Sequence, residues 1–403
     1  MLDDAADQVH LPRRRNVRLD TLLRLRWLAI IGQTTAVLVV YYGLDFPLPI
    51  WACLAVIALS AWLGRLPGGL LHTNIGSCAL FAATSGSSVA TAATVGTVAL
   101  PSLMKRGYSM RASLGTLAAG GTLGILIPPS VNMIVYGSLT NNSIGKLFIA
   151  GIIPGLVLTG CFMLWIWVSS VASGTVKRED KVPLDQRLRT LQFLVPPLVV
   201  FGIVMGSLYF GIATTTESAA LGVIAALLFV WQSGKLSWEV LRTCFISTAR
   251  VSGMILLIIM AAFILNLTIS LTGVADAMTK AVTSLGLSAT TMILVLIVFY
   301  LILGMFMDVL SMQVATIPIT YPIVTALGVD PIWFGIFIVL MCELGLITPP
   351  VGMNLFVVHG IRRDKGGIED AIWGALPYVL IMIGFTLLLI AVPGLATWLP
   401  AKM

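Results

Sequence analysis

Apolar residues dominate the chain in continuous runs that short polar segments separate. The runs cover residues 27–44, 49–63, 66–84, 88–104, 112–127, 130–137, 147–172, 190–211, 218–232, 251–270, 289–306, 308–326, 331–348, 351–358 and 371–397. In lipid a helix satisfies its own backbone hydrogen bonds, so this pattern predicts an all-α membrane protein built as a polytopic helical bundle.

Several runs are shorter than the roughly 20 residues that a membrane-spanning helix needs. The short ones come in pairs, 66–84 with 88–104, 112–127 with 130–137, 289–306 with 308–326, and 331–348 with 351–358, each interrupted by Gly, Ser, Asp or Pro-Pro. Non-helical backbone is tolerated at membrane depth only inside protein or beside a wet cavity. The pairs therefore predict re-entrant hairpins and broken helices.

A shift of 221 residues superimposes the turn residues of the first half on those of the second. It places Pro101 on Pro322, Gly107 on Gly328, Leu123-Gly124 on Leu344-Gly345, and Pro128-Pro129 on Pro349-Pro350, without a gap. A random overlay would rarely match two Pro-Pro pairs and further turn residues at one offset. The sequence therefore predicts two repeats, each with a re-entrant hairpin and a broken helix.

Charge orients the two copies. The loop 105–111 carries Lys105, Arg106 and Arg111, whereas its mate 326–332 carries no basic residue. The positive-inside rule places the first loop in the cytoplasm and the second in the periplasm. The repeats are thus expected to be inverted, an arrangement that builds a midplane binding site in many secondary transporters.

The basic clusters also orient the rest of the chain. Arg13, Arg14, Arg15 and Arg18 predict a cytoplasmic N-terminus for a multi-pass protein of the bacterial inner membrane, and the charged start predicts that the first span is its own anchor. We divide the chain into a basic N-terminus (1–26), two transmembrane helices (27–63), a truncated first transport repeat (64–172), a basic cytoplasmic loop (173–189) and a second transport repeat (190–403). The polar stretch 273–288 is expected to lie at the membrane interface.

Composition narrows the functional classes. The chain is 58% hydrophobic and 10% charged, and its net charge of +7 comes from basic residues in short loops, which disfavours nucleic-acid binding. The 5 cysteines show no CxxC spacing, and no Gly-rich phosphate loop, HExxH or nucleophile motif appears. Neither an enzyme nor a cofactor is predicted.

Backbone and hydroxyl oxygens are the first candidate ligands. The tip of the first hairpin reads Ser85-Gly86-Ser87-Ser88, which offers amides, carbonyls and hydroxyls to a cation or an anionic substrate group. The alternative is close helix packing by small residues.

The Pro-Pro pairs are the second candidate. Each removes two consecutive N–H donors, so the upstream carbonyls of Gly124, Ile125, Gly345 and Leu346 are predicted to be unpaired and available to Na⁺. The alternative is a kink that neighbouring helices satisfy.

Polar side chains in apolar surroundings complete the candidates. Asp308 occupies the second tip, and Glu217 and Glu343 lie within apolar runs, where an ionisable group is functional by default unless a basic side chain pairs with it. Asn132 and Asn354 follow the Pro-Pro pairs, as candidates for binding a substrate carboxylate or for capping a helix. The predicted substrate-binding set is Asn132, Asn354, Ser87 and Asp308.

From about residue 64 onward the chain resembles the large membrane subunit (DctM type) of tripartite ATP-independent periplasmic (TRAP) transporters. The resemblance is carried by LPGGLLHTNIG (66–76), SGSSVATAATVGTVALPSLMKRGY (85–108), AAGGTLGILIPPSVNMIVYG (118–137), GKLFIAGIIPG (145–155), GIATTTESAALGV (211–223), GMFMD (304–308) and LGLITPPVGMNLFV (344–357). It implies Na⁺-driven import of an organic acid, a C4-dicarboxylate or related carboxylate, by an elevator-type movement. It also implies two partners, a small membrane subunit (DctQ type) and a periplasmic substrate-binding protein (DctP type).

The resemblance further implies the cation ligands. In the first repeat they are Ser85, Ser87, Ser88, Gly124, Ile127 and Pro129. In the second they are Gly304, Gly345, Thr348 and Val351. One departure is Thr215, where the family often has proline.

The start of the chain departs further. Residues 14–63 resemble the membrane sensor region of a RegB/PrrB-type redox histidine kinase, but no kinase core follows. The offset also leaves segment 190–221 without a copy in the first half. Two alternatives to a TRAP subunit follow: an ion-coupled carboxylate transporter that works without a binding protein, and a transport-incompetent hybrid that acts as a membrane sensor or anchor.

Overall fold

The computed structural model describes residues 59–174 and 194–403, apart from positions 61, 65, 235, 285, 363 and 365. All of them belong to one compact unit, residues 51–403. The predicted N-terminus (1–26), nearly all of the kinase-like stretch 14–63 and residues 175–189 of the basic loop lie outside the described residues.

The first repeat begins with a helical hairpin, α3 (Leu70–Ser85) and α4 (Ser88–Lys105). A broken helix follows, made of α5 (Met110–Gly121), α6 (Leu123–Leu126) and α7 (Val131–Thr140), with a bend of 40° at the break. The long helix α8 (Ile144–Ala172) closes this repeat.

The second repeat has the same order of elements. Its hairpin is α14 (Ala289–Gly304) and α15 (Val309–Ala326), its broken helix is α16 (Pro331–Leu346) and α17 (Met353–Gly360), and its closing helix is α18 (Glu369–Ala391). After the 221-residue shift both ends of α4 coincide with those of α15, and both Pro-Pro bonds are cis. The predicted repeat is thus confirmed, with both hairpins and both broken helices.

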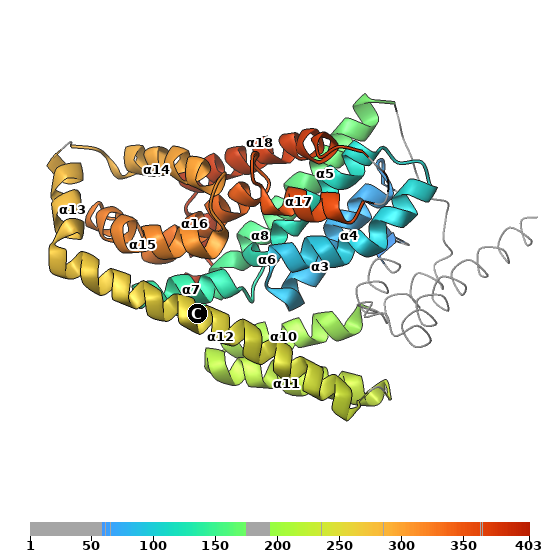
Figure 1. Ribbon diagram of the computed structural model, residues 1–403, viewed down its shortest axis with the longest axis horizontal. Coiled ribbons are helices and arrows are strands. Elements are labelled where there is room, and N and C mark those ends of the chain that lie inside the picture. Colours follow the sequence, from blue (N-terminus) through green and yellow to red (C-terminus); the bar gives the residue numbers. More distant parts are fainter. Residues whose placement is uncertain are drawn as a thin grey trace, which may run out of the picture. The chain divides into compact units, whose positions relative to one another are not determined.

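Figure 1 shows that the hairpins enter from opposite ends, α3–α4 from the right and α14–α15 from the left, with their tips toward the middle. The repeats also interlock. Helix α7 of the first packs on α15 of the second, whereas α17 of the second packs on α4 and α5 of the first. The predicted fold class, an all-α membrane bundle with two inverted repeats, describes this structure.

Helix α16 is the centre of the core, because every residue from Trp333 to Leu346 is buried. Glycine lets the repeats approach closely elsewhere. A Cβ on Gly115 of α5 would lie 2.1 Å from the Gly374 carbonyl oxygen of α18. Side chains larger than hydrogen are therefore excluded at this contact between the repeats.

Four helices follow α8 and precede the second hairpin in the sequence: α10 (Val195–Tyr209), α11 (Thr215–Gln232), α12 (Trp238–Thr272) and α13 (Val274–Ser284). Helix α12 starts well before the predicted run 251–270, because Ser237 caps its N-terminus by accepting a hydrogen bond from the Val240 amide. Its 35 residues span about 52 Å, more than the roughly 30 Å hydrocarbon core. The short helices α19 (Gly394–Thr397) and η1 (Pro400–Lys402) end the chain.

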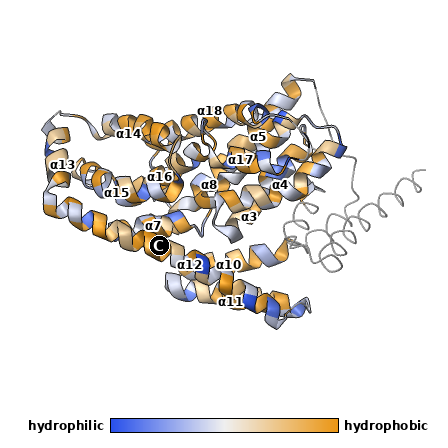
Figure 2. Cartoon of the chain, in the orientation of Figure 1, coloured by the Kyte–Doolittle hydropathy of each residue, from blue (hydrophilic) through white to orange (hydrophobic). Residues whose placement is uncertain are grey.

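Among the described residues, 5 helices are long and apolar enough to cross a membrane, or 6 if the bent pair α5–α7 counts as one span. Figure 2 shows hydrophobic residues along most of the helices. Burial separates two kinds of span: 56% of the most apolar window of α8 is buried, against 6% for α12. The α12 surface is thus left for lipid or for another protein.

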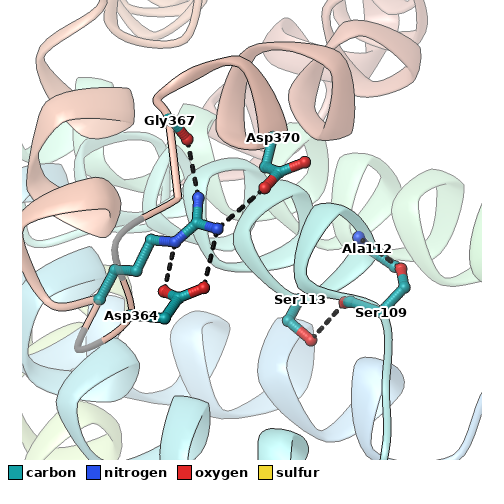
Figure 3. Close-up of polar contacts among 7 residues, drawn as sticks. Ser109, Ala112, Ser113, Asp364, Gly367 and Asp370 are labelled. Atoms are coloured by element: carbon teal, nitrogen blue, oxygen red, sulfur yellow. Dashed lines mark hydrogen bonds and ion pairs between the residues drawn. The ribbon is translucent and has the colours of Figure 1, made fainter.

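The connection between α17 and α18 is organised by Arg362 (Figure 3). Its guanidinium donates to both oxygens of Asp364, to Asp370 (3.0 Å) and to the Gly367 carbonyl (2.7 Å). The hydrogen bonds to Asp364 raise the pKa of Arg362 and lower the pKa of Asp364. The corresponding turn after α7 is uncharged and uses Asn141 with a positive φ of 55°.

Candidate functional site

The first hairpin tip is a sharp reversal in which the Ser85 and Ser87 side chains make local hydrogen bonds. Gly86 ends α3 in the left-handed conformation, with φ of 61°, and Ser87 caps α4 by accepting from the Ala90 amide (3.4 Å). The Thr91 hydroxyl donates to the Ser87 carbonyl at 2.7 Å and lies 2.8 Å from the Ser85 hydroxyl. The tip therefore has a fixed shape.

This tip lies directly against the first break. A Cβ on Gly124 would be 2.6 Å from both the Ser87 carbonyl oxygen and the Ser88 Cα, and one on Gly86 would be 2.7 Å from the Pro129 carbonyl oxygen. The structure thus brings Ser87, Ser88, Gly124 and Pro129 of the predicted cation set together.

The other two members of that set make local hydrogen bonds. Ser85 is bonded within the tip, and Ile127 ends the short helix α6 in an extended conformation.

The second tip meets the second break in the same way. A Cβ on Gly304 would lie 2.8 Å from the Gly345 Cα, and the Val351 amide donates to the Met305 carbonyl at 3.2 Å. The Thr348 hydroxyl donates to the Leu344 carbonyl at 2.6 Å, within its own turn. Gly304, Gly345 and Val351 therefore lie together, with Thr348 beside them.

One expectation about the second break is wrong. The Gly345 carbonyl was predicted to be unpaired because proline replaces its usual donor four residues on. The Thr348 amide, three residues on, donates to it at 3.3 Å instead. A tighter terminal turn thus occupies this carbonyl in part.

The two asparagines do not cap helices. The N-caps of α7 and α17 are Ser130 and Gly352, neither of which makes a side-chain capping bond. Asn354 is fully buried, and its Nδ2 donates across the repeats to the Ala118 carbonyl at 3.4 Å while its Oδ1 has no partner. The Nδ2 of the buried Asn132 has no partner either.

Two carboxylates have structural partners at helix starts. Asp308, of the predicted substrate set, caps α15 by accepting from the Leu310 and Ser311 amides at 3.1 and 3.2 Å. Glu217 closes a capping box at α11, where it accepts from the Thr214 amide (2.8 Å) and hydroxyl (2.9 Å). Glu217 therefore pairs with the capping residue Thr214 of its own helix and not with a basic side chain.

The apolar surroundings of Glu343 predict a functional carboxylate, but Glu343 is not one of the predicted ligands. It is fully buried on α16, and its Oε1 accepts from the Ser88 hydroxyl at 2.6 Å and the Ile125 amide at 3.0 Å. Its Oε2 has no hydrogen-bond partner. A carboxylate in an apolar run was the available signal, but a partner 255 residues away could not be read from the sequence.

Inverted repeats with paired hairpin tips and helix breaks define a polytopic membrane transporter. The sequence matches the family described as "Tripartite ATP-independent periplasmic transporter, DctM component" over residues 54–395. The chain belongs to this family of transporter permeases. The match begins at residue 54, so the permease region includes part of the stretch predicted to be kinase-like.

Relatives agree with this assignment. The C4-dicarboxylate TRAP transporter large permease protein DctM of Pseudomonas aeruginosa is 36% identical over 350 residues, which cover 85% of this chain and 79% of that protein. The ectoine TRAP transporter large permease protein TeaC of Halomonas elongata is 32% identical over 344 residues, 84% of this chain and 79% of that protein.

A solved structure shares the fold. The YdaH transporter of Alcanivorax borkumensis has a TM-score of 0.58 at 16% identity, with 93% of this chain and 89% of that chain covered. At this identity the likeness concerns the fold alone.

Proposed function

We propose that this chain is the permease subunit of a Na⁺-coupled transporter that imports a C4-dicarboxylate or a related carboxylate by an elevator-type movement. The observation that carries the proposal is the contact of each hairpin tip with the glycine of its own helix break, at Gly124 and at Gly345. Each contact gathers carbonyl and hydroxyl oxygens where two polypeptide segments meet.

Oxygen ligands are what a hard cation such as Na⁺ requires. The first site offers the serines of the tip with the backbone at Gly124, Ile127 and Pro129. The second offers the backbone at Gly304, Gly345 and Val351 with the Thr348 hydroxyl. Gly124 and Gly345 are buried, whereas Ser87 is half-buried and Val351 is exposed, so each proposed site can be reached from the surface. Interrupted helices leave backbone groups for ligands.

The substrate is proposed from side chains and relatives. Asn132 is a buried amide whose Nδ2 has no partner, and amide N–H groups donate to carboxylates, whereas the unpartnered atom of Asn354 is its acceptor Oδ1. Three bacterial permeases, each named as a C4-dicarboxylate transporter subunit, are 32–36% identical to this chain. These two observations favour a carboxylate.

Two partners belong to the proposal, a small membrane subunit and a periplasmic substrate-binding protein. The little-buried α12 offers surface for the membrane subunit. The complex would lie in the inner membrane, with the N-terminus of this chain in the cytoplasm and the basic loop Lys105, Arg106 and Arg111 on the same side.

The test is uptake by the reconstituted complex. The full chain is placed in liposomes with its small subunit, and labelled C4-dicarboxylate is supplied with the binding protein. We expect an inward Na⁺ gradient to accelerate uptake and replacement of Na⁺ by K⁺ to abolish the acceleration. Equal uptake in both salts would contradict Na⁺ coupling.

Two arms address the alternatives. Uptake that persists without the binding protein would indicate a transporter that works alone. No uptake in any arm, from a folded chain, would favour the sensor or anchor.

A further inference from the structure

Glu343 links the second repeat to the cation site proposed for the first. It lies on α16, yet both groups that donate to its Oε1 belong to the first repeat. Ser88 is the first residue of α4 at the hairpin tip, and Ile125 follows Gly124 at the break. One carboxylate oxygen therefore bonds both the hairpin tip and the helix break of the first site.

A buried carboxylate that stays ionised requires a compensating positive charge or full hydrogen bonding. Glu343 has neither, because its Oε2 has no partner and its Oε1 is bonded only to neutral donors. Ion pairs among the described residues join Arg362 to Asp364 and Asp370, and none involves Glu343. A cation bound beside Ser88 and Gly124 would supply the missing charge.

The second site has no equivalent of this carboxylate. The 221-residue shift places Thr122 at the position of Glu343. Thr122 is also fully buried, but its hydroxyl donates to the Ala119 carbonyl at 2.6 Å in its own helix. The repeats thus share a backbone arrangement and differ in charge at this position.

We propose that Glu343 is the counter-charge and the positioning residue of the first cation site. The inference rests on the proposed function, since it requires that this site binds Na⁺. The ligands identified by resemblance are neutral hydroxyls and carbonyls, and Glu343 adds one negative charge immediately behind them. It also fixes the Ser88 hydroxyl and the Ile125 amide, so a cation entering the site meets ligands that are already oriented.

A single helix then contacts both tips. Glu343 bonds the first tip, and Gly345, two residues further along α16, packs against Gly304 of the second. Loss of the Glu343 charge is therefore expected to weaken the first site while the glycine contact at the second is kept.

The decisive variant is Glu343→Gln, because its amide oxygen can accept both hydrogen bonds without the charge. The purified full chain is titrated with NaCl against choline chloride at constant ionic strength, and thermal unfolding reports Na⁺ binding independently of transport. We expect Glu343→Gln to raise the Na⁺ concentration at half-maximal stabilisation about 10- to 100-fold, the range for losing one charged contact. Without Na⁺ it should unfold no earlier than the wild type.

Thr122→Val is the matched control at the equivalent position of the other repeat, and should change the Na⁺ midpoint less than about twofold. Glu343→Asp, which keeps the charge on a shorter side chain, should restore part of the Na⁺ response. At saturating Na⁺ the substrate KM of Glu343→Gln should approach that of the wild type, because the defect is in cation binding.

The outcomes separate the two proposals. If the wild type responds to Na⁺ and Glu343→Gln has the same midpoint, the counter-charge is wrong and the proposed function stands. If the wild type itself shows no response to Na⁺, the proposed function fails and the inference with it.

Discussion

The two tip-and-break regions are built on one backbone plan with different side chains. In each, a hairpin tip packs on a glycine of the broken helix, at Gly124 in the first repeat and Gly345 in the second. The first tip is capped by Ser87 through one amide contact, whereas the second is capped by Asp308 through two. The first also receives Glu343 from the other repeat.

This difference separates the residues that the backbone packing requires from the charged residues that would affect cation binding. Close approach of tip and break requires glycine in both repeats, because any Cβ would collide with backbone. The charged groups are not symmetric. The Glu343 carboxylate contacts the first tip and break, whereas the Asp308 carboxylate lies at the second tip. We infer that the sites have similar shapes and unequal affinities for a cation.

The largest effects are expected from the glycines. Gly124→Ala and Gly345→Ala each place a Cβ within 2.7 Å of backbone in the opposing segment, so tip and break must separate. We expect a loss of stability of about 1–3 kcal/mol or more and the loss of most Na⁺-dependent uptake. Thermal unfolding and uptake measure the two effects.

The matched control is Gly160→Ala in α8, because a Cβ there meets nothing within 4 Å. It should be neutral or slightly stabilising, since alanine favours a helix more than glycine does. If alanine were tolerated at 124 but not at 345, the tips would not be held equally closely.

The helix caps should have intermediate effects. Asp308→Ala removes an acceptor for two amides, and we expect unfolding to become easier by about 1–2 kcal/mol. Ser87→Ala removes one long capping bond, and about 0.5–1 kcal/mol is expected. Both are measured without Na⁺, so that capping is separated from cation binding.

Asp308→Asn provides the control, because asparagine caps helices as well as aspartate does. Full stability with reduced substrate affinity in Asp308→Asn would show that the charge serves the substrate. Unchanged affinity would leave Asp308 with a structural role only.

The smallest effect is expected at the ends of the broken helices, where the second repeat has the Arg362 cluster and the first has an uncharged turn. Arg362→Ala should lower the melting temperature slightly, and high salt should reduce the difference because the carboxylates are partly exposed. The pKa of Asp364 is lowered in the folded state, so its contribution is present at neutral pH and is lost as the pH falls through that pKa. An effect at neutral pH as large as that of the glycine variants would contradict this ranking.

The sequence by itself determined much of the architecture. The apolar runs predicted the helices, because a chain in lipid must satisfy its backbone hydrogen bonds within each segment. The common offset between Pro101 and Pro322 and between the two Pro-Pro pairs predicted the repeat. The breaks were predictable for the same reason, since two adjacent prolines cannot donate to a helix. The early start of α12 was missed because its polar arm lacks the apolar pattern.

Only the tertiary structure decided which of these pieces meet. The contacts of Glu343 with Ser88, of Asn354 with Ala118 and of Gly115 with Gly374 each join residues of different repeats. Periodicity and charge describe a segment in its solvent, whereas such contacts depend on how helices far apart in the chain pack together. The identity of a buried carboxylate's partner, and hence the asymmetry between the two sites, is therefore a property of the packing.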